Sequence, residues 1–276
     1  MLTVSIVTYN TPLGELGQCL DSLGVGVVER VFVVDNSRSD DIMRFCHQRA
    51  NVEYVQSDNR GYGAGHNQGI ARGIGLGADY HLVINSDIYF TPSILCRIME
   101  YMDREKDVAM VHPAVFYPDG RLQYTSRLLP RPIDVFARRF LPGCLVRGIN
   151  RRYLLEQDPH TVPFDCPYHQ GSFMMLRVGA LKDTGVFDER FFMYPEDIDL
   201  TRRLHRNYRT MFWPEVSIVH CHRAASYGCM KMTWIHVKNM IMYFNKWGWL
   251  FDRERRAVNR EVLKGMELRK KCGPRP

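Results

Sequence analysis

The sequence lacks any hydrophobic stretch long enough to cross a bilayer. A membrane-spanning helix needs roughly 20 consecutive apolar residues, and no uninterrupted run in the 276-residue chain approaches that length. The first ten residues, MLTVSIVTYN, also lack the basic start and the longer apolar run of a secretory signal peptide. We therefore expect a protein with cytoplasmic access, whose contact with a membrane, if it has one, is at the surface.

The sequence also lacks any Cys-x-x-Cys pair, although it contains eight cysteines. In a chain without a secretory signal, scattered cysteines are expected to be reduced thiols rather than disulfides. The group His220-Cys221-His222, with Cys229 nearby, offers zinc-type ligands, but its spacing matches no common zinc finger. A disulfide scaffold and a structural zinc site are therefore both disfavoured.

Composition is ordinary for a soluble globular protein, with 45% hydrophobic and 24% charged residues. The length suits one large domain with a modest appendage. A net charge of +7 favours phosphates, anionic lipid surfaces or nucleic acid as partners, without choosing among them. Because no recognised nucleic-acid-binding motif is present, we do not expect a nucleic-acid partner.

Short apolar strands alternate with helical segments in the first 90 residues. The predicted strands are TVSIVTYN, VERVFVVDN, VEYVQSDN and YHLVINSD, and the predicted helices are ELGQCLDSL, SDDIMRFCHQRA and the glycine-rich GYGAGHNQGIARGIGLG. This alternation predicts an α/β fold with a mostly parallel sheet covered by helices on both faces. In such sheets, ligands gather at the carboxyl ends of the strands.

Polar residues follow four of these strands in succession, at Asn10, Asp35, Asn59 and Asp87. Two of them are aspartates that follow runs of Val, Ile or Leu, and a buried carboxylate is costly unless it is paired or holds a metal. Together they predict a lined cleft. The alternative is ordinary turn chemistry, which Asn and Asp also favour.

The glycine cluster at 61–65 invites comparison with a dinucleotide-binding loop. That fingerprint belongs after the first strand, with an acidic residue about 20 positions further on. Here the cluster follows the third strand. We therefore do not expect a dinucleotide cofactor.

The pattern loosens after Pro113. Residues 117–153 are rich in Pro and Arg, and we expect a basic surface excursion without regular structure, either simply solvated or offering anion contacts from Arg131, Arg138, Arg139, Arg151 and Arg152. Regularity returns with a strand in GSFMMLRV, a helix that starts at Pro195 with an acidic first turn, and a strand in TMFWPEVSIVHCH.

The segment from Met232 onward is predicted to be helical, aromatic and basic. Val258, Val262 and Met266 fall on one helix face amid many Arg and Lys residues. A basic amphipathic helix of this kind can lie on an anionic membrane surface. The alternative is a terminal helix that packs on its own domain.

These residues suit chemistry on a phosphate-rich donor. Mg²⁺ or Mn²⁺ takes few protein ligands, mostly carboxylates, and completes its shell with water and phosphate oxygens. Asp87 is a suitable first ligand, and His220 or His222 a second. Asp35 could accept a hydrogen bond from a pyrimidine N3–H. Asp197 could remove a proton from an acceptor hydroxyl, with Glu196 positioning that hydroxyl; the alternative is that both acids only stabilise the start of their helix.

Seven motifs in order carry a resemblance to a known family. VSIVTYN, VVDN, DNRGYGAGHNQGI, LVINSD, GSFMML, GVFDERFFMYPEDIDLTRRL and IVHCHRAAS resemble the motifs of family 2 inverting glycosyltransferases. More narrowly, they are similar to the bacterial rhamnosyltransferase-like branch that builds O-antigen, capsule and related polysaccharides. The resemblance runs from Leu2 to about Asp252.

The resemblance implies a GT-A fold, with a catalytic domain at 1–231 and a helical extension at 232–276. It also implies a UDP- or dTDP-sugar donor, a divalent metal ion, and inversion at the sugar. The residues implied for the donor site are Thr8, Asn10, Asp35, Gly61, Asn67, Asn85 and Asp87. Asp87 and His220 would hold the metal, and Asp197 would be the catalytic base, with Glu196 beside it. One departure is that the DXD element reads Asn85-Ser86-Asp87, so its first carboxylate is missing.

The resemblance further implies a saccharide acceptor on a polyprenyl diphosphate at the inner face of the cell membrane, where the enzyme would be a peripheral protein. The alternative is a partner protein that keeps the fold, binds glycan or membrane, and has lost activity. The missing carboxylate at Asn85 favours that alternative, while the presence of Asp87 and Asp197 speaks against it.

Overall fold

The strands predicted from the first half of the sequence lie side by side in one large sheet. The computed structural model describes residues 1–24, 26–140, 142–221 and 230–272. Within these ranges, the large sheet consists of β1 (Leu2–Thr8), β2 (Arg30–Asp35), β3 (Val52–Gln56), β4 (Tyr80–Ile84), β5 (Ile88–Tyr89), β6 (Val108–Phe116), β8 (Phe164–Asp165), β10 (Phe173–Arg177) and β11 (Arg209–His220). Their order is β3-β2-β1-β4-β10-β6-β11-β5, with β8 beside β11.

The register of the sheet brings several strand ends to one edge. β1, β2, β3 and β4 run parallel to one another, with Thr8 opposite Asp35 and Ile6 opposite Ile84. β10 is antiparallel to both β4 and β6, while β11 is parallel to β6. The carboxyl ends of β1, β2, β4, β6 and β11 therefore share an edge with the start of β10.

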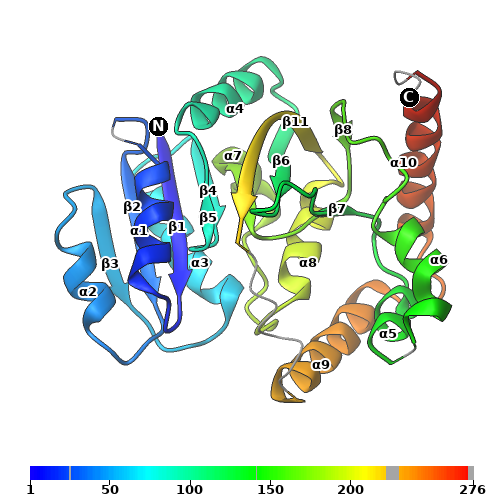
Figure 1. Cartoon of the computed structure of the whole chain (residues 1–276), viewed down its shortest axis with the longest axis horizontal. Coiled ribbons are helices and arrows are strands. Elements are labelled where there is room, and N and C mark those ends of the chain that lie inside the picture. The colour runs from blue at the N-terminus through cyan, green and yellow to red at the C-terminus, as the bar shows by residue number, and fades with distance from the viewer. Residues whose placement is uncertain (25, 141, 222–229, 273–276) are drawn as a thin grey trace.

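Helices cover both faces of this sheet (Figure 1). One face packs against α1 (Leu13–Ser22), α2 (Asp41–Cys46) and α4 (Ser93–Arg104), which bury their apolar sides in a common cluster with the strands. The other face packs against α3 (Tyr62–Gly75), α7 (Val178–Thr184) and α8 (Pro195–Leu204). The prediction of a mostly parallel sheet with helices on both faces is confirmed.

The expectation of an irregular excursion after Pro113 is wrong for much of its length. β6 runs on to Phe116, and 117–153 contains β7 (Ser126–Arg127), α5 (Pro132–Phe140) and α6 (Gly143–Tyr153), while β7 pairs with β9 (Tyr168–His169) in a small second sheet. Leu128 and Leu129 are completely buried. Tertiary burial orders this segment although its periodicity is weak. The side chains of Arg138 and Arg139 lie outside the described part of the structure.

The C-terminal extension consists of α9 (Met230–Trp247) and α10 (Arg253–Cys272). Tyr243, Phe244 and Val262 are buried in one cluster with Ile198 and Phe212 of the catalytic part. The division expected at residue 231 therefore separates two parts that share a core. Along the described chain, no helix is both long and apolar enough to cross a membrane.

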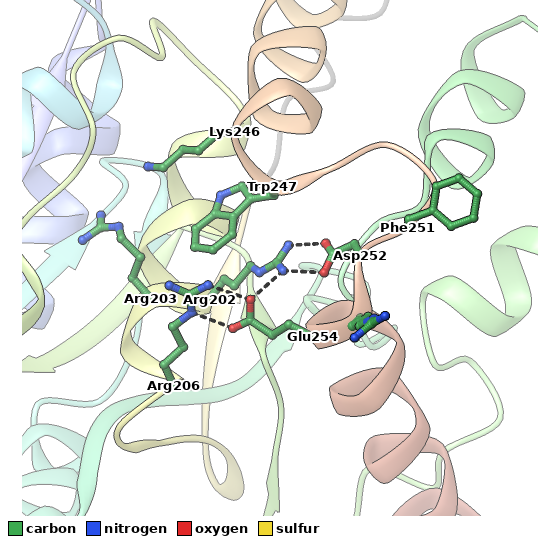
Figure 2. A pocket seen from close by; sticks show the side chains of 9 residues that line it. Arg202, Arg203, Arg206, Lys246, Trp247, Phe251, Asp252 and Glu254 are labelled. Atoms are coloured by element: carbon green, nitrogen blue, oxygen red, sulfur yellow. Dashed lines mark hydrogen bonds and ion pairs between the residues drawn. The ribbon is translucent and has the colours of Figure 1, made fainter.

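A buried ion pair fastens the extension to α8. Both terminal nitrogens of Arg202 lie 2.8 Å from oxygens of Asp252, and Nη2 also lies 2.8 Å from Glu254 Oε2. Trp247 covers the guanidinium, with its ring centre 4.1 Å from Cζ (Figure 2). Arg202 and Asp252 are only 2% and 3% exposed. Because both charges are shielded from water, each depends on the other for its stability.

We predict that Asp252→Ala lowers the free energy of unfolding by about 3–5 kcal/mol, since removal of one partner leaves a buried charge without its main counter-ion. Urea unfolding measures the change. The matched control is Glu261→Ala on the same helix, whose pair with Lys264 is well exposed and worth about 0–1 kcal/mol. Equal losses in the two variants would contradict a structural role for the buried pair.

Candidate active site

Two neighbouring carboxyl groups begin α8. Pro195 opens the helix, Glu196 and Asp197 fill its first turn, and Tyr194 before it holds a φ of 93°. A left-handed conformation in a residue other than glycine costs about 1–3 kcal/mol and is most common at functional sites. The Asp197 carboxylate accepts hydrogen bonds from the backbone N–H of Ile198 (2.8 Å) and of Gly171 (2.9 Å). Its direction is thus fixed by two different segments.

Burial shifts the pKa of both carboxyl groups upward. Burial raises the pKa of Asp197 to about 6, even though the two backbone hydrogen bonds and the charge of Arg127 act to lower it. Burial and the neighbouring Asp197 raise the pKa of Glu196 well above its ordinary value. Glu196 Oε2 is buried and has no hydrogen-bond partner among the described residues. Burial therefore makes both carboxyl groups better proton acceptors than an exposed carboxylate.

Arg127 is a site residue that the sequence analysis did not single out. Burial disfavours its charge, but Tyr168, Tyr153 and Asp197 favour it, so that its pKa is raised overall. Its Nε donates to the carbonyl of Tyr124 at 2.9 Å. Its position in β7, opposite Tyr168 of β9, brings it near the start of α8. No sequence signal separates it from the many other arginines around it.

A second pair of groups, Asp87 and His220, lies where the segment between β4 and β5 meets the end of β11. β5 pairs with the end of β11, so that Ile88 lies opposite His220, and the N–H of Cys221 donates to the carbonyl of Asp87 at 2.9 Å. His220 Nε2 lies 3.3 Å from Asp87 Oδ1. The predicted association of Asp87 with His220, two residues 133 positions apart in the sequence, is present in the structure.

Gln123, another residue that the sequence analysis missed, orients His220. Its Nε2 donates to the His220 carbonyl (2.9 Å), which leaves its Oε1 to accept from His220 Nδ1 (3.1 Å). The proton of a neutral His220 is then on Nδ1, and the lone pair of Nε2 faces the Asp87 carboxylate. A divalent cation, or a proton on Nε2, stabilises such an arrangement.

The donor set fits a hard divalent cation that takes few protein ligands. Within the described ranges no group of three or more His, Cys, Asp or Glu residues could hold a metal ion. Mg²⁺ needs only one or two carboxylates when phosphate and water supply its other ligands. Asp87 and His220 meet that need. His222 and Cys229, the other metal-type candidates, lie outside the described residues.

Tyr62 links the two pairs of groups. Its hydroxyl lies 2.9 Å from Asn85 Oδ1 and 2.7 Å from the carbonyl of Gly171, the residue whose N–H binds Asp197. Burial and the negative charges of Glu196, Asp197 and Asp87 raise the pKa of the phenol well above its ordinary value. The phenol therefore stays protonated, and its hydroxyl connects the end of β4 with the residue that binds Asp197. Asn85, the departure from the DXD pattern, makes a hydrogen bond that an ionised carboxylate could also accept.

The residues predicted to bind the nucleotide cluster at the ends of β1 and β2. Asp35 is completely buried, and its carboxylate accepts hydrogen bonds from the Thr8 hydroxyl (2.9 Å), the Ser37 N–H (3.0 Å) and the Tyr54 hydroxyl (3.2 Å). Asn10 has a left-handed φ of 52°, and its N–H donates to the Ser37 hydroxyl. Asp35 thus joins three strands, and its contact with a base stays a prediction.

Gly61 and Asn67 face the segment that leads into α8. The Asn67 side chain donates to the Phe187 carbonyl (2.9 Å) and accepts from the Phe187 N–H (3.0 Å). Gly61 has a φ of 106°, and a Cβ there would lie 2.1 Å from the Phe192 carbonyl oxygen. Both residues position this segment, and their contact with a donor stays a prediction.

Comparisons with known proteins identify the family and the fold. A family model described as "Glycosyl transferase family 2" matches residues 3–185. An N-acetylglucosaminyl-diphospho-decaprenol L-rhamnosyltransferase of Mycobacterium tuberculosis is 29% identical over 246 residues, which cover 83% of this chain and 78% of that protein. Rhamnosyltransferase WbbL of Escherichia coli is 27% identical over 227 residues, 78% of this chain and 81% of the relative.

Among solved structures, the mannosyltransferase PcManGT from Pyrobaculum calidifontis, in complex with GDP-Man and Mn²⁺, superposes with a TM-score of 0.55 at 16% identity. The match covers 89% of this chain and 63% of that one. At this identity the likeness shows the fold, which is GT-A as expected.

We predict that Gly61→Ala lowers the free energy of unfolding by more than about 2 kcal/mol, because the new methyl group collides with the backbone of Phe192 and the φ is unfavourable. Urea unfolding measures the loss. Gly75→Ala, at the last residue of α3, has no atom within 4 Å of the added Cβ and should instead stabilise the protein by about 0.5–1 kcal/mol. A neutral Gly61→Ala would disprove the close approach.

Proposed function

The chain belongs to glycosyl transferase family 2, in its rhamnosyltransferase-like branch, and from this premise we propose that it transfers a rhamnosyl or hexosyl group from a UDP- or dTDP-sugar to a saccharide on a polyprenyl diphosphate. The observation that carries the proposal is the set of hydrogen bonds that joins the two acidic parts of the site: Gly171 N–H donates to Asp197, and the Tyr62 hydroxyl bonds both to the Gly171 carbonyl and to Asn85, two residues before Asp87. Donor activation and proton removal need separate carboxylates within one site, and this arrangement supplies them.

The sheet register supports a place for the donor. β2, β1 and β4 are adjacent strands, and strands in a sheet lie about 4.8 Å apart, so the end of β2 and the end of β4 are about 10 Å apart. A nucleoside diphosphate can extend along such a row, with its base near Asp35 and its diphosphate near Asp87. A structure of the same fold contains GDP-Man and Mn²⁺, which supports a nucleotide sugar and a divalent ion here.

Asp87 and His220 would hold Mg²⁺ or Mn²⁺. When bound there, the ion would neutralise the charge that develops on the diphosphate leaving group. The protein's own contribution is the fixed direction of both ligands, Asp87 through the pairing of β5 with β11 and His220 through Gln123. Metal-binding histidines are typically oriented in this way, by a hydrogen bond from the ring nitrogen that does not bind the metal.

Asp197 would act as the general base in a single displacement with inversion. Its carboxylate takes the proton from an acceptor hydroxyl, the hydroxyl oxygen bonds to the anomeric carbon, and the bond from that carbon to the diphosphate breaks. A pKa near 6 keeps Asp197 ionised at neutral pH and still basic enough to accept a proton. Glu196, beside it in the first turn of α8, can form a hydrogen bond that positions the acceptor hydroxyl.

The acceptor assignment draws on a relative and on the extension. The mycobacterial relative's name specifies a saccharide diphosphate on decaprenol. Acceptors of this type are embedded in a membrane, so the enzyme must work at its surface. The extension exposes Trp234, Leu250 and Phe251 and carries many basic residues. We therefore propose peripheral association with the inner face of the cell membrane.

We predict that Asp197→Asn folds normally and lowers kcat by about 10²- to 10⁴-fold, the usual contribution of a positioned base. For the wild type, log kcat/KM should rise with pH and level off above about pH 6, because the base must lose its proton. Transfer assays between about pH 5 and 8 check both.

The control is Asp79→Asn, at the opposite edge of the sheet, which should keep wild-type activity. Near-normal turnover in Asp197→Asn would refute the assignment, and a wild type inactive with every donor would favour the non-catalytic alternative.

We predict that UDP or dTDP raises the melting temperature in the presence of Mn²⁺. At a nucleotide concentration of 100 Kd the gain is about 2.7 kcal/mol, or roughly 5–10 °C for a chain of this size. Asp87→Ala should remove the part of the shift that depends on Mn²⁺, whereas Asp79→Ala should keep it. A full Mn²⁺-dependent shift in Asp87→Ala would exclude Asp87 as a metal ligand.

A further inference from the structure

A groove of about 950 Å³ lies between α5, the end of α6 and the first half of α10. Its walls come from the segment that the sequence analysis expected to be irregular and from the C-terminal extension, which lie next to each other on one side of the sheet (Figure 1). None of the residues assigned above to metal, donor or base lines it. The groove is therefore separate from the candidate active site.

The groove is cationic. Its basic lining residues are Arg131, Arg152, Arg255, Arg256, Arg260 and Lys264, and its acidic lining residue is Glu267. Three further acids lie against these cations: Asp134 at 2.7 Å from Arg131, Glu261 at 2.9 Å from Lys264 and Asp252 at 3.9 Å from Arg255. Arg256 and Arg260 are exposed on α10. Six basic residues thus face four acidic ones, and the net positive charge attracts anions.

Arg152 supplies the most specific feature of the groove. Its Nη1 is buried and has no hydrogen-bond partner among the described residues. Burial and the like charge of Arg131 lower its pKa. A buried guanidinium N–H without an acceptor is costly, and a phosphate oxygen is the acceptor that arginine binds best. By contrast, Arg255 already donates to the carbonyls of Pro130 and Trp249.

Apolar side chains border these cations. Leu250 is 64% exposed and Ile133 is 51% exposed, and both line the groove with Trp249. The adjacent Phe251 is 85% exposed and points away from the Arg202 ion pair (Figure 2). A soluble anion would leave these apolar groups in water, whereas a lipid would cover them. Basic residues with exposed Trp, Phe and Leu beside them are typical of surfaces that lie in a membrane interface.

We propose that this groove binds the headgroup phosphate of an anionic phospholipid, with Arg152 donating to the phosphate, Arg256 and Arg260 adding attraction, and Leu250 and Phe251 entering the acyl region. The inference rests on the membrane association in the proposed function and gives it a site. The bound lipid would fix the position of α10. Since Asp252, at the start of α10, is bonded to Arg202 of α8, the same contact would orient the candidate active site toward the membrane.

Vesicle flotation tests the proposal. The full chain should float with vesicles made of phosphatidylglycerol and phosphatidylcholine. It should remain unbound when the vesicles contain phosphatidylcholine alone. Arg256→Glu/Arg260→Glu should weaken binding to the anionic vesicles roughly tenfold or more, because each basic residue at the surface adds to the affinity. The control Arg104→Glu/Lys106→Glu makes the same change of net charge at the end of α4, where both residues are exposed, and should bind within about twofold of the wild type.

Two further measurements separate a lipid site from a general cationic surface. Arg152→Gln should weaken binding to anionic vesicles more than Arg104→Gln does. Brominated acyl chains should quench the fluorescence of the wild type more than that of Trp249→Phe. Equal flotation of the two double variants, equal binding to phosphatidylcholine alone, or full displacement by glycerol phosphate would overturn the proposal. Displacement by glycerol phosphate would mean a site for soluble phosphate.

Activity on a short-chain, water-soluble acceptor distinguishes this inference from the proposed function. Arg256→Glu/Arg260→Glu should transfer sugar to that acceptor at the wild-type rate. If the wild type floats with anionic vesicles but transfers no sugar, the proposed function is refuted and the lipid site is not. If the wild type transfers sugar but does not float with anionic vesicles, the lipid site is refuted and the proposed function is not.

Discussion

The backbone of Gly171 holds the candidate active site together. Its N–H binds the Asp197 carboxylate, and its carbonyl accepts from the Tyr62 hydroxyl, which also reaches Asn85 at the end of β4. Gly171 lies two residues before β10, the antiparallel strand between β4 and β6. A Cβ at this position would lie 3.1 Å from the Asp197 Cβ, so glycine allows the close approach. Through this residue the start of α8 is held in register with the segment after β4 that carries Asp87, so Asp87 and Asp197 keep a constant separation.

The opposite end of α8 is fixed by the extension. Arg202 and Asp252 form a buried pair under Trp247, while Asp199 accepts from the Trp247 indole (2.8 Å) and lies 2.7 Å from Lys246. α8 is therefore constrained at its first turn by the sheet and at its last turn by α9 and α10. The inner faces of these helices complete the core. The exposed apolar and basic side chains beside the groove are on the outer side, where the proposed membrane contact would be. Packing on the domain and contact with a lipid surface, which are alternatives for a helix considered alone, involve different sides of this extension.

Hydrophobic pattern and turn chemistry were sufficient for most of the fold. The apolar runs that end at Thr8, Asp35 and Ile84 are strands, and Pro195 starts a helix, because these local signals and the tertiary burial agree. The local sequence signals failed to predict the helices in 117–153. There, α5 and α6 are ordered by contacts with β11 and the extension instead of by their own periodicity. α4 and β6 received no assignment, and the antiparallel direction of β10 is a property of strand pairing that no short segment encodes.

The sequence by itself determined which chemical groups are available: a carboxylate after a buried strand, an acidic first turn on a helix, and a histidine at the end of another strand. Their side-chain types and local positions depend only on neighbouring residues, and the order of the motifs was enough to indicate the family. The tertiary structure alone decided which groups meet and in what state of charge. Gln123, Tyr62 and Arg127 belong to the site only because segments distant in the chain pack together, and the raised pKa of Asp197 arises from burial by those segments. Burial and proximity are properties of the folded chain, so these features have no signature in the sequence.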